Sequence, residues 1–311
     1  PFTVTMNGDP SIQKRPMGRV MKPLREMGAS IEGKNDNFCP LTLFPSELHG
    51  IEYRLPVASA QLKSAILLAG LYAEGQTTVI EPAPSRDHTE RMFRALGVEI
   101  ETSGNTITLD PPEDLHAVDI AVPGDISSAA FFLVAGAIIP GSELTIKNVG
   151  VNPTRTGVLD VLRDMGADIR WEGDALVSRA SRLHGLRVDC AQMPDLVPIL
   201  AVAMAAAEGE SRITGAARLR IKESDRLSAM AAALTAAGAD AAELPDGLAI
   251  RGGKPLHATQ IEGCNDHRIV MAMAIASALS DGEWTITDAE ATAKSAPAFW
   301  REFERLGGRT R

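Results

Sequence analysis

The densest run of charged residues in the chain is Arg218–Leu227, which reads Arg-Leu-Arg-Ile-Lys-Glu-Ser-Asp-Arg-Leu. Cationic Lys222 and Arg226 alternate here with Glu223 and Asp225. Such a mixture suits anion binding and proton transfer, but it also suits a solvated helix start with charge pairs one turn apart. The run alone leaves both interpretations open.

Basic residues recur where a helix is expected to begin. Because a helix N-terminus already carries partial positive charge, a basic residue is unfavourable there unless an anion binds. The repetition therefore predicts sites for phosphate or carboxylate groups. The residues concerned are Lys14, Arg15, Arg86, Arg155, Lys222, Arg226 and Lys294.

A second set of polar residues precedes long apolar runs. Asp125 fits a helix N-cap fully, whereas His267 and Arg268 at the start of an apolar helix suggest a binding role. Asp195 is either an N-cap or an ionised carboxylate that accepts a hydrogen bond from a substrate hydroxyl. Together these helix ends predict a cleft between two bodies for a small, multiply anionic ligand.

Composition limits the classes of protein that need considering. The 311 residues contain 45% hydrophobic and 23% charged residues, with a net charge of −9. An acidic protein is a poor candidate for coating nucleic acid, and no apolar stretch approaches the roughly 20 residues that span a bilayer. Three widely separated cysteines, Cys39, Cys190 and Cys264, predict neither a disulfide framework nor a zinc site. No Rossmann or P-loop glycine motif occurs.

The elements that position these residues repeat along the chain. The pattern Leu-Arg-Glu-Met-Gly-Ala-Ser-Ile at residues 24–31 returns, with variation, four more times, and each copy predicts a helix that ends at a glycine before a strand. The glycines are Gly28, Gly97, Gly166, Gly238 and Gly307.

Helices that are apolar nearly all round, and so buried, interleave with this pattern. They are expected at residues 59–73, 127–139, 194–207 and 266–279, each followed by a β-branched strand. Only four such helices accompany five glycine patterns, so we expect the sequence to lack at least one half-unit at its N-terminal end. A hinge-like segment near residue 118 predicts an incomplete first domain, 1–118, and a second domain, 119–311.

Six segments occur in the order typical of one enzyme family. They are Gln13–Arg19, Ala58–Ala65, Pro194–Asp195, Ile221–Leu227, Asn265–Arg268 and Thr292–Lys294. Over its whole length the chain resembles the 3-phosphoshikimate 1-carboxyvinyltransferase (5-enolpyruvylshikimate-3-phosphate synthase) family, in its class II branch. Two upstream family motifs are absent, so the resemblance implies a chain without about the first quarter of the enzyme, inactive alone.

The resemblance implies a fold and a reaction. The fold is α/β: two domains of pseudo-symmetric βαβαββ repeats with buried helices, an inside-out α/β barrel. The reaction transfers the enolpyruvyl group of phosphoenolpyruvate to the 5-hydroxyl of shikimate 3-phosphate by addition and elimination, releasing phosphate without a metal or other cofactor. The implied setting is a cytoplasmic monomer without nucleic-acid or membrane partners.

The resemblance also implies roles for individual residues. Catalytic roles fall to Asp195, which accepts the hydroxyl proton, to its neighbour Lys222, and to Glu223, which moves a proton at the methylene carbon. Shikimate 3-phosphate contacts are implied for Ser59, Ala60, Gln61, Arg86, Asp195 and Lys222. Phosphoenolpyruvate contacts are implied for Arg15, Gln61, Arg226, Arg268 and Lys294.

Two other hypotheses remain open from the sequence. UDP-N-acetylglucosamine enolpyruvyl transferase shares the fold and uses a reactive loop cysteine. Cys39 is expected in a loop, at residues 34–40, although without that enzyme's arginine-rich signature. A non-catalytic remnant that only binds ligand is the third hypothesis. The remaining histidines, His49, His88, His116, His184 and His257, are expected to be structural or surface residues.

Overall fold

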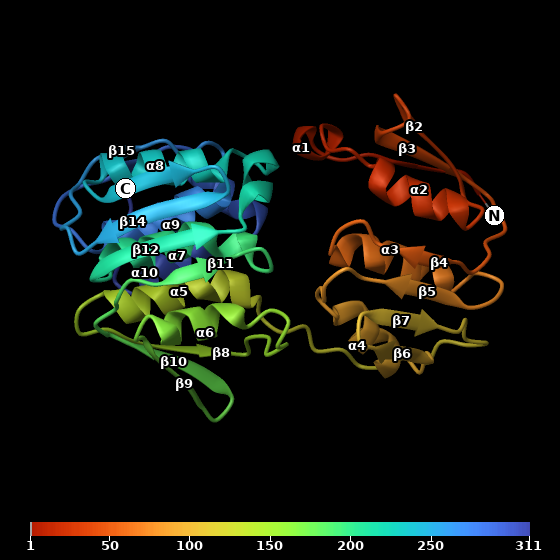
Figure 1. Ribbon diagram of the computed structural model, residues 1–311. Coiled ribbons are helices and arrows are strands. Elements are labelled where there is room, and N and C mark those ends of the chain that lie inside the picture. Colours follow the sequence, from red (N-terminus) through yellow and green to blue (C-terminus); the bar gives the residue numbers. More distant parts are fainter. Residues whose placement is uncertain (1) are drawn as a thin grey trace. The chain divides into compact units, whose positions relative to one another are not determined.

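The computed structural model describes residues 2–311, and these form two compact units. Unit 1 ends at Ala121 and unit 2 comprises Val122–Arg311, whereas the sequence alone places the boundary near residue 118. Within the described residues, no helix is both long and apolar enough to cross a bilayer. The two units are coloured red to yellow and green to blue in Figure 1.

One complete repeat in unit 1 shows the common plan of strand, helix, strand, helix, strand, strand (Figure 1). The first two strands pair in parallel and the last two form an antiparallel hairpin, so the sheet order is β4-β5-β7-β6. Parallel pairing requires a crossover connection, which the first helix supplies. The elements are β4 (Glu52–Arg54), α3 (Ala60–Gly70), β5 (Thr77–Ile80), α4 (His88–Ala95), β6 (Ile100–Ser103) and β7 (Thr106–Leu109).

Unit 2 contains a repeat with the same connectivity and the same sheet order, β11-β12-β14-β13. Short 3₁₀ helices, η1 and η2, precede its two α-helices. The elements are β11 (Arg187–Asp189), η1 (Pro194–Leu196), α7 (Val197–Ala206), β12 (Gly209–Thr214), η2 (Ala217–Ile221), α8 (Arg226–Ala236), β13 (Asp240–Leu244) and β14 (Gly247–Gly252).

The other three repeats are partial versions of this plan. Two of them lack the first strand of the plan and form three-stranded sheets, in the orders β1-β3-β2 and β8-β10-β9. The last has only the first two strands of the plan, the parallel pair β15-β16. The first comprises β1 (Val4–Met6), α1 (Pro10–Gln13), α2 (Gly18–Glu26), β2 (Ser30–Lys34) and β3 (Phe38–Phe44). The others comprise α5 (Ile126–Ile138), β8 (Glu143–Lys147), α6 (Gly157–Asp164), β9 (Asp168–Glu172), β10 (Ala175–Arg179), β15 (Gln260–Ile261), α9 (His267–Ser277), β16 (Thr285–Ile286), η3 (Ala289–Lys294) and α10 (Phe299–Arg305). The predicted α/β repeat architecture is confirmed.

Three of the four helices expected to be buried are buried, whereas α3 is buried on one face only and leaves Leu68 47% exposed. In unit 2, α5, α7 and α9 pack against one another in the centre of the core, and Val197–Ala205 of α7 is buried without interruption. Helix α3 occupies the same position in its own repeat but carries a charged side chain, Lys63, that is only 1% exposed. The sequence pattern did not predict a buried lysine there.

The predicted helix-terminating glycines all have left-handed backbone conformations, with φ between 83° and 105°. At Gly238 a Cβ atom would lie 2.5 Å from the His257 ring, so only glycine fits. Four histidines that the sequence analysis expected to be structural or surface residues cap the C-terminal ends of four of these helices. The backbone N–H groups of His49, His116, His184 and His257 donate to the carbonyls of Met27, Leu96, Met165 and Ala237.

One expectation about a cysteine is wrong. Cys39 does not lie in a loop, because it is the second residue of strand β3, where it is buried. Its side chain is buried, while that of the next residue, Pro40, is exposed, as expected for successive side chains on opposite faces of a strand. A reactive loop cysteine at this position is therefore excluded.

Candidate active site

The first turns of the buried helices in unit 2 gather polar side chains. Asp125 and Asp266 cap α5 and α9 by accepting backbone N–H groups of Ser127 and Arg268 at 3.1 and 2.9 Å. Asp195 lies in η1, directly before α7. Because α5, α7 and α9 pack together, their N-terminal ends combine free N–H groups and partial positive charge.

Arg226, the first residue of α8, contacts three carboxylates while only 2% of its side chain is exposed. Its Nε donates to Asp266 Oδ2 at 2.8 Å, its Nη1 to Asp195 Oδ1 at 3.2 Å and its Nη2 to Glu223 Oε2 at 2.8 Å. Burial alone would lower the pKa of Arg226, but its hydrogen bond and charge pairing with Asp266, Glu223 and Asp195 raise it. The guanidinium therefore stays charged and oriented.

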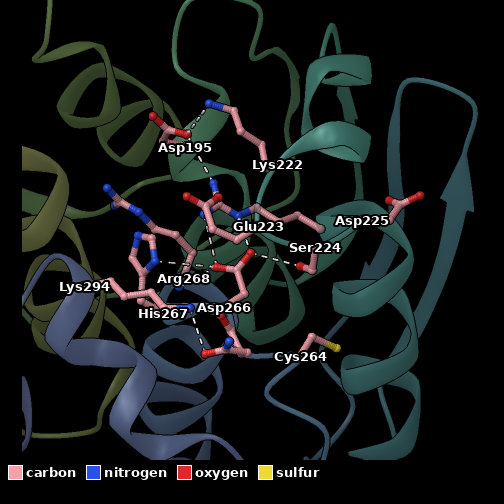
Figure 2. Close-up of polar contacts among 12 residues, drawn as sticks. Asp195, Lys222, Glu223, Ser224, Asp225, Cys264, Asp266, His267, Arg268 and Lys294 are labelled. Atoms are coloured by element: carbon pink, nitrogen blue, oxygen red, sulfur yellow. Dashed lines mark hydrogen bonds and ion pairs between the residues drawn. The ribbon is translucent and has the colours of Figure 1, made fainter. Parts of the chain in front are cut away.

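Asp266 is the most enclosed acid of this network, with a fully buried side chain. It accepts two hydrogen bonds from Arg226, one from Ser224 Oγ at 2.9 Å and one from the Arg268 backbone. Burial is the largest influence on Asp266 and would raise its pKa, yet the hydrogen bonds and charge of Arg226, together with the bonds from the Arg268 amide and Ser224, outweigh burial and the pKa is lowered. Figure 2 shows Ser224 and the rest of this network converging on the Asp266 carboxylate.

The other side of the network is partly open to solvent. The side chains of Asp195, Lys222 and Glu223 are 26%, 28% and 23% exposed. Lys222 Nζ lies 3.4 Å from Asp195 Oδ1, the same oxygen that faces Arg226. Because this carboxylate is partly exposed, an incoming anion can replace it beside Lys222 or Arg226, and an incoming hydroxyl can donate a hydrogen bond to it.

Arg268, in the first turn of α9, is buried beside α5. Its Nη1 donates to the Ser127 carbonyl at 3.2 Å, and its guanidinium lies 5.8 Å from the centre of the Phe131 ring. Within the described residues, its buried Nε has no hydrogen-bond partner. Burial is the largest cause that lowers the pKa of Arg268, with Arg226 and Arg155 adding like-charge repulsion.

Arg155 and Asp125 lie on the same side of the site as Arg268. Arg155 Nη2 lies 2.7 Å from Asp125 Oδ1 and donates to Ser127 Oγ at 2.6 Å. Burial would raise the pKa of Asp125, but the Ser127 amide and the charges of Arg155 and Arg268 outweigh it and lower the pKa. The basic residue predicted at the start of α6 therefore pairs with an acid of the chain itself.

Lys294, at the end of η3, reaches the same region through Asn265. Its Nζ donates to the backbone carbonyl and the side-chain oxygen of Asn265 at 2.6 and 2.7 Å. Asn265 has a left-handed backbone, and its N–H donates to Asp288. This turn places Lys294 beside the Asp266–Arg268 segment, as Figure 2 shows.

His267 lies between Asp266 and Arg268 and is 7% exposed. Burial, followed by the positive charge of Arg268, lowers the pKa of His267 to about 4. Its Nδ1 is 3.9 Å from Asp266 Oδ1 and has no hydrogen-bond partner among the described residues. The ring is neutral at pH 7.

The remaining predicted site residues belong to unit 1. Ser59 caps α3 by accepting the Leu62 N–H at 3.4 Å, and its hydroxyl donates to Gln61 Oε1 at 3.4 Å. Ala60 is the first residue of α3, where backbone N–H groups are free of helical partners. Arg86 lies in the segment before α4, and Arg15 lies between α1 and α2. The structure thus joins Ser59, Ala60 and Gln61 in one helix turn and leaves Arg15 and Arg86 on other segments.

A spacing that the sequence analysis missed relates the buried helices to one another. Each has a polar residue near its start, 14 residues before a left-handed glycine; this residue is the second of α3, α5 and α9, and for α7 it lies in η1, two residues before the helix begins. Three of these were predicted as site residues, and the fourth was predicted only as part of the α5 helix. The pairs are Gln61 with Gly75, Ser127 with Gly141, Asp195 with Gly209 and Arg268 with Gly282. Counting back from the glycines would have identified Ser127.

The repeats and their charged helix ends define the class: the chain has the enolpyruvyl transferase fold. An enolpyruvyl transferase structure, NikO from Streptomyces tendae, superposes with a TM-score of 0.82 at 20% identity, covering 99% of this chain and 74% of that one. At this identity the likeness establishes the fold alone.

The family within that class follows from closer relatives. A family model described as EPSP synthase (3-phosphoshikimate 1-carboxyvinyltransferase) matches residues 1–303. The 3-phosphoshikimate 1-carboxyvinyltransferase of Synechocystis sp. is 51% identical over 96% of this chain and 70% of its own length. That of Synechococcus sp. is 49% identical over 97% and 72%. An EPSP synthase structure from Acinetobacter baumannii has a TM-score of 0.86 at 43% identity, over 99% and 74%. The chain belongs to the EPSP synthase family of transferases.

Proposed function

We propose that this protein transfers the enolpyruvyl group of phosphoenolpyruvate to the 5-hydroxyl of shikimate 3-phosphate and releases phosphate. The reaction belongs to the shikimate pathway of aromatic amino acid biosynthesis. The observation that carries the proposal is the Asp195 carboxylate, which contacts Lys222 and Arg226 at the N-terminal ends of packed helices. A proton acceptor beside cations suits a reaction between a hydroxyl and an anionic partner.

Phosphoenolpyruvate is assigned to the arginine side of the network. Arg268 supports this role because its buried Nε has no partner in the described chain. All three nitrogens of Arg226 donate to carboxylates, so an anion binds there by replacing Asp195 or Glu223. The residues proposed for this substrate are Arg15, Gln61, Arg226, Arg268 and Lys294.

Shikimate 3-phosphate is assigned to the first turn of α3 and to the open side of the unit 2 network. Free backbone N–H groups at a helix N-terminus bind phosphate and carboxylate well. The residues proposed for this substrate are Ser59, Ala60, Gln61, Arg86, Asp195 and Lys222.

The proton movements follow from these assignments. In the addition step the 5-hydroxyl oxygen bonds to C2 of phosphoenolpyruvate, its proton passes to Asp195, and C3 gains a proton to become a methyl group. In the elimination step the methyl group loses a proton, the C2–O bond to phosphate breaks, and the enol ether remains. Glu223 is the proposed group for the proton at C3, and Lys222 is the proposed contact to the 5-hydroxyl oxygen. We further propose a cytoplasmic location and a monomer.

The substitution Asp195→Asn, made in a protein of the relatives' full length, tests the assignment. It keeps the shape of the side chain but removes the proton acceptor, so turnover falls about a thousandfold. Calorimetric titration of shikimate 3-phosphate into the variant still gives an affinity close to that of the unmodified protein. Unchanged turnover would remove Asp195 from the mechanism, and absence of binding to the unmodified protein would contradict the proposed function itself.

The alternative, transfer to UDP-N-acetylglucosamine, lacks support from the described residues. The cysteine that it requires would be Cys39, which is buried in β3. Supplying each acceptor separately with phosphoenolpyruvate distinguishes the two reactions, because only shikimate 3-phosphate should release phosphate.

A further inference from the structure

Unit 1 encloses three charged side chains that have no role in the proposed chemistry. Lys63, Glu81 and Glu90 have side chains that are only 1%, 3% and 3% exposed. Lys63 Nζ lies 2.9 Å from Glu81 Oε2 and 2.6 Å from Glu90 Oε1. We call this cluster the Lys63 triad.

The triad is an unfavourable way to stabilise a core. One ammonium faces two carboxylates, and the second oxygens, Glu81 Oε1 and Glu90 Oε2, have no hydrogen-bond partner among the described residues. Apolar side chains of similar volume usually stabilise a protein as well as a buried ion pair or better. We therefore look to the positions of the segments that the triad connects for the reason that these three charged side chains are retained.

Other repeats fold without a charge at this position. Lys63 stands 12 residues before the left-handed Gly75, and the same spacing from Gly141, Gly209 and Gly282 gives Ala129, Val197 and Val270. The helices that carry these three residues, α5, α7 and α9, are packed in the core of unit 2. The fold of a repeat therefore does not require the lysine.

The triad joins the segments that bear the proposed shikimate 3-phosphate contacts of unit 1. Lys63 lies one turn beyond Ser59, whose carbonyl accepts its N–H at 3.0 Å, so the lysine is rigidly linked to the start of α3. Glu90 lies in the first turn of α4, and Glu81 follows β5. Glu81 Oε2 also accepts the Ser85 N–H at 3.4 Å, directly before Arg86.

We propose that Lys63 is a positioning residue for the shikimate 3-phosphate site: by bridging Glu81 and Glu90 it holds the first turn of α3 at a fixed distance from the Arg86 segment. This inference rests on the proposed function. Misplacement of a binding group by about 1 Å is enough to weaken binding or rate by one to two orders of magnitude. The fixed spacing therefore determines affinity for this substrate, whereas phosphoenolpyruvate contacts in unit 2 do not depend on it.

The test separates positioning from stability by replacing the whole triad. The variant Lys63→Met/Glu81→Leu/Glu90→Leu, made in the full chain, removes every buried charge and keeps similar volume, so the thermal midpoint is expected to stay or rise. Calorimetric titration of shikimate 3-phosphate is expected to show a dissociation constant about tenfold higher. In the assay, KM for shikimate 3-phosphate is expected to rise more than KM for phosphoenolpyruvate, because Gln61 is the only proposed phosphoenolpyruvate contact in the first turn of α3, while kcat stays near its original value.

A folded triple variant with unchanged affinity for shikimate 3-phosphate would overturn the inference. If the triple variant does not fold, the single variant Glu81→Leu tests the inference instead. It keeps the Lys63–Glu90 ion pair, which has no net charge, and removes the carboxylate that accepts the Ser85 N–H. Reduced affinity in that variant supports the inference, and unchanged affinity overturns it.

A matched control uses another polar bridge between α3 and α4. The hydroxyls of Ser64 and Thr89 lie 2.6 Å apart, and Ser64→Ala removes this contact without touching the triad. Substrate affinity is expected to stay unchanged, whereas a loss equal to that of the triple variant would assign the effect to general helix docking. No binding by the unmodified protein would contradict the proposed function and is distinguishable from all these outcomes.

Discussion

The two units enclose charge in different ways. In unit 1 a single lysine faces two glutamates, and all three side chains of the Lys63 triad are at most 3% exposed. In unit 2 the corresponding buried helix, α7, is apolar throughout, and the charges lie at the ends of α8 and α9 instead. There Arg226 is enclosed, but Asp195, Lys222 and Glu223 remain about a quarter exposed.

This difference in exposure suits the two clusters to different roles, one structural and one chemical. A fully enclosed cluster cannot exchange partners without opening the core, so it fixes distances. A network with one solvent-accessible side can release a carboxylate or lysine to a ligand while Asp266 keeps Arg226 oriented. The proposed catalytic residues all lie on the accessible side of the second cluster.

The largest expected effect contrasts two lysines. Lys63→Met leaves two buried carboxylates without a cation and should lower the free energy of unfolding by about 4 kcal/mol. Lys222→Met removes one partly exposed ion pair and should cost less than about 1 kcal/mol. Urea denaturation of both variants measures the difference, and equal effects would contradict the distinction between an enclosed and an accessible cluster.

A second expectation concerns pH and His267 in the unit 2 network. Because burial lowers its pKa from 6.5 to about 4, the unfolded chain binds a proton that the folded chain does not bind between these values. Stability should therefore fall as pH decreases from 6.5 to 4, by up to about 3 kcal/mol from this residue. The lowered pKa values of Asp266 and Asp125 affect stability only below the usual carboxyl value of 3.8, where the unfolded chain takes up protons that the folded chain does not.

The measurement compares denaturation midpoints of the unmodified protein and His267→Gln across this pH range. The variant lacks the titrating ring, so its stability should change less with pH. An identical slope in both proteins would show that another group causes the dependence.

The smallest expected effect compares two hydroxyl groups. Ser224→Ala removes a hydrogen bond to the buried Asp266 carboxylate and should cost about 2 kcal/mol, because bonds to charged groups exceed neutral ones. Ser64→Ala removes a neutral hydroxyl pair in unit 1 and should cost about 1 kcal/mol. Thermal unfolding of the two variants gives the order, and a larger loss from Ser64→Ala would contradict it.

Much of the fold could be predicted because it depends on local patterns. Glycines such as Gly28 and Gly166 end helices through their own backbone, and apolar runs such as residues 197–205 indicate burial directly. The network around Asp195 and Lys222 could also be anticipated, since both stand at helix starts within motifs of the family.

What could not be predicted depends on contacts between distant segments. Asp266 reads as a helix cap, yet it also orients Arg226, which is 40 residues away. Lys63 reads as one polar residue in an apolar helix, and only the fold brings Glu81 and Glu90 to it. Cys39 was misplaced because the polar residues before it resemble a loop, while β3 already begins at Phe38.

The polar residue that stands 14 residues before a left-handed glycine, at the start of each buried helix, has a wider consequence. Four copies of one structural unit present an amide at Gln61, a hydroxyl at Ser127, a carboxylate at Asp195 and a guanidinium at Arg268 from equivalent places. The four repeats share this position and differ in the side chain that stands there. An architecture built of near-identical parts can in this way recognise molecules that have no symmetry at all.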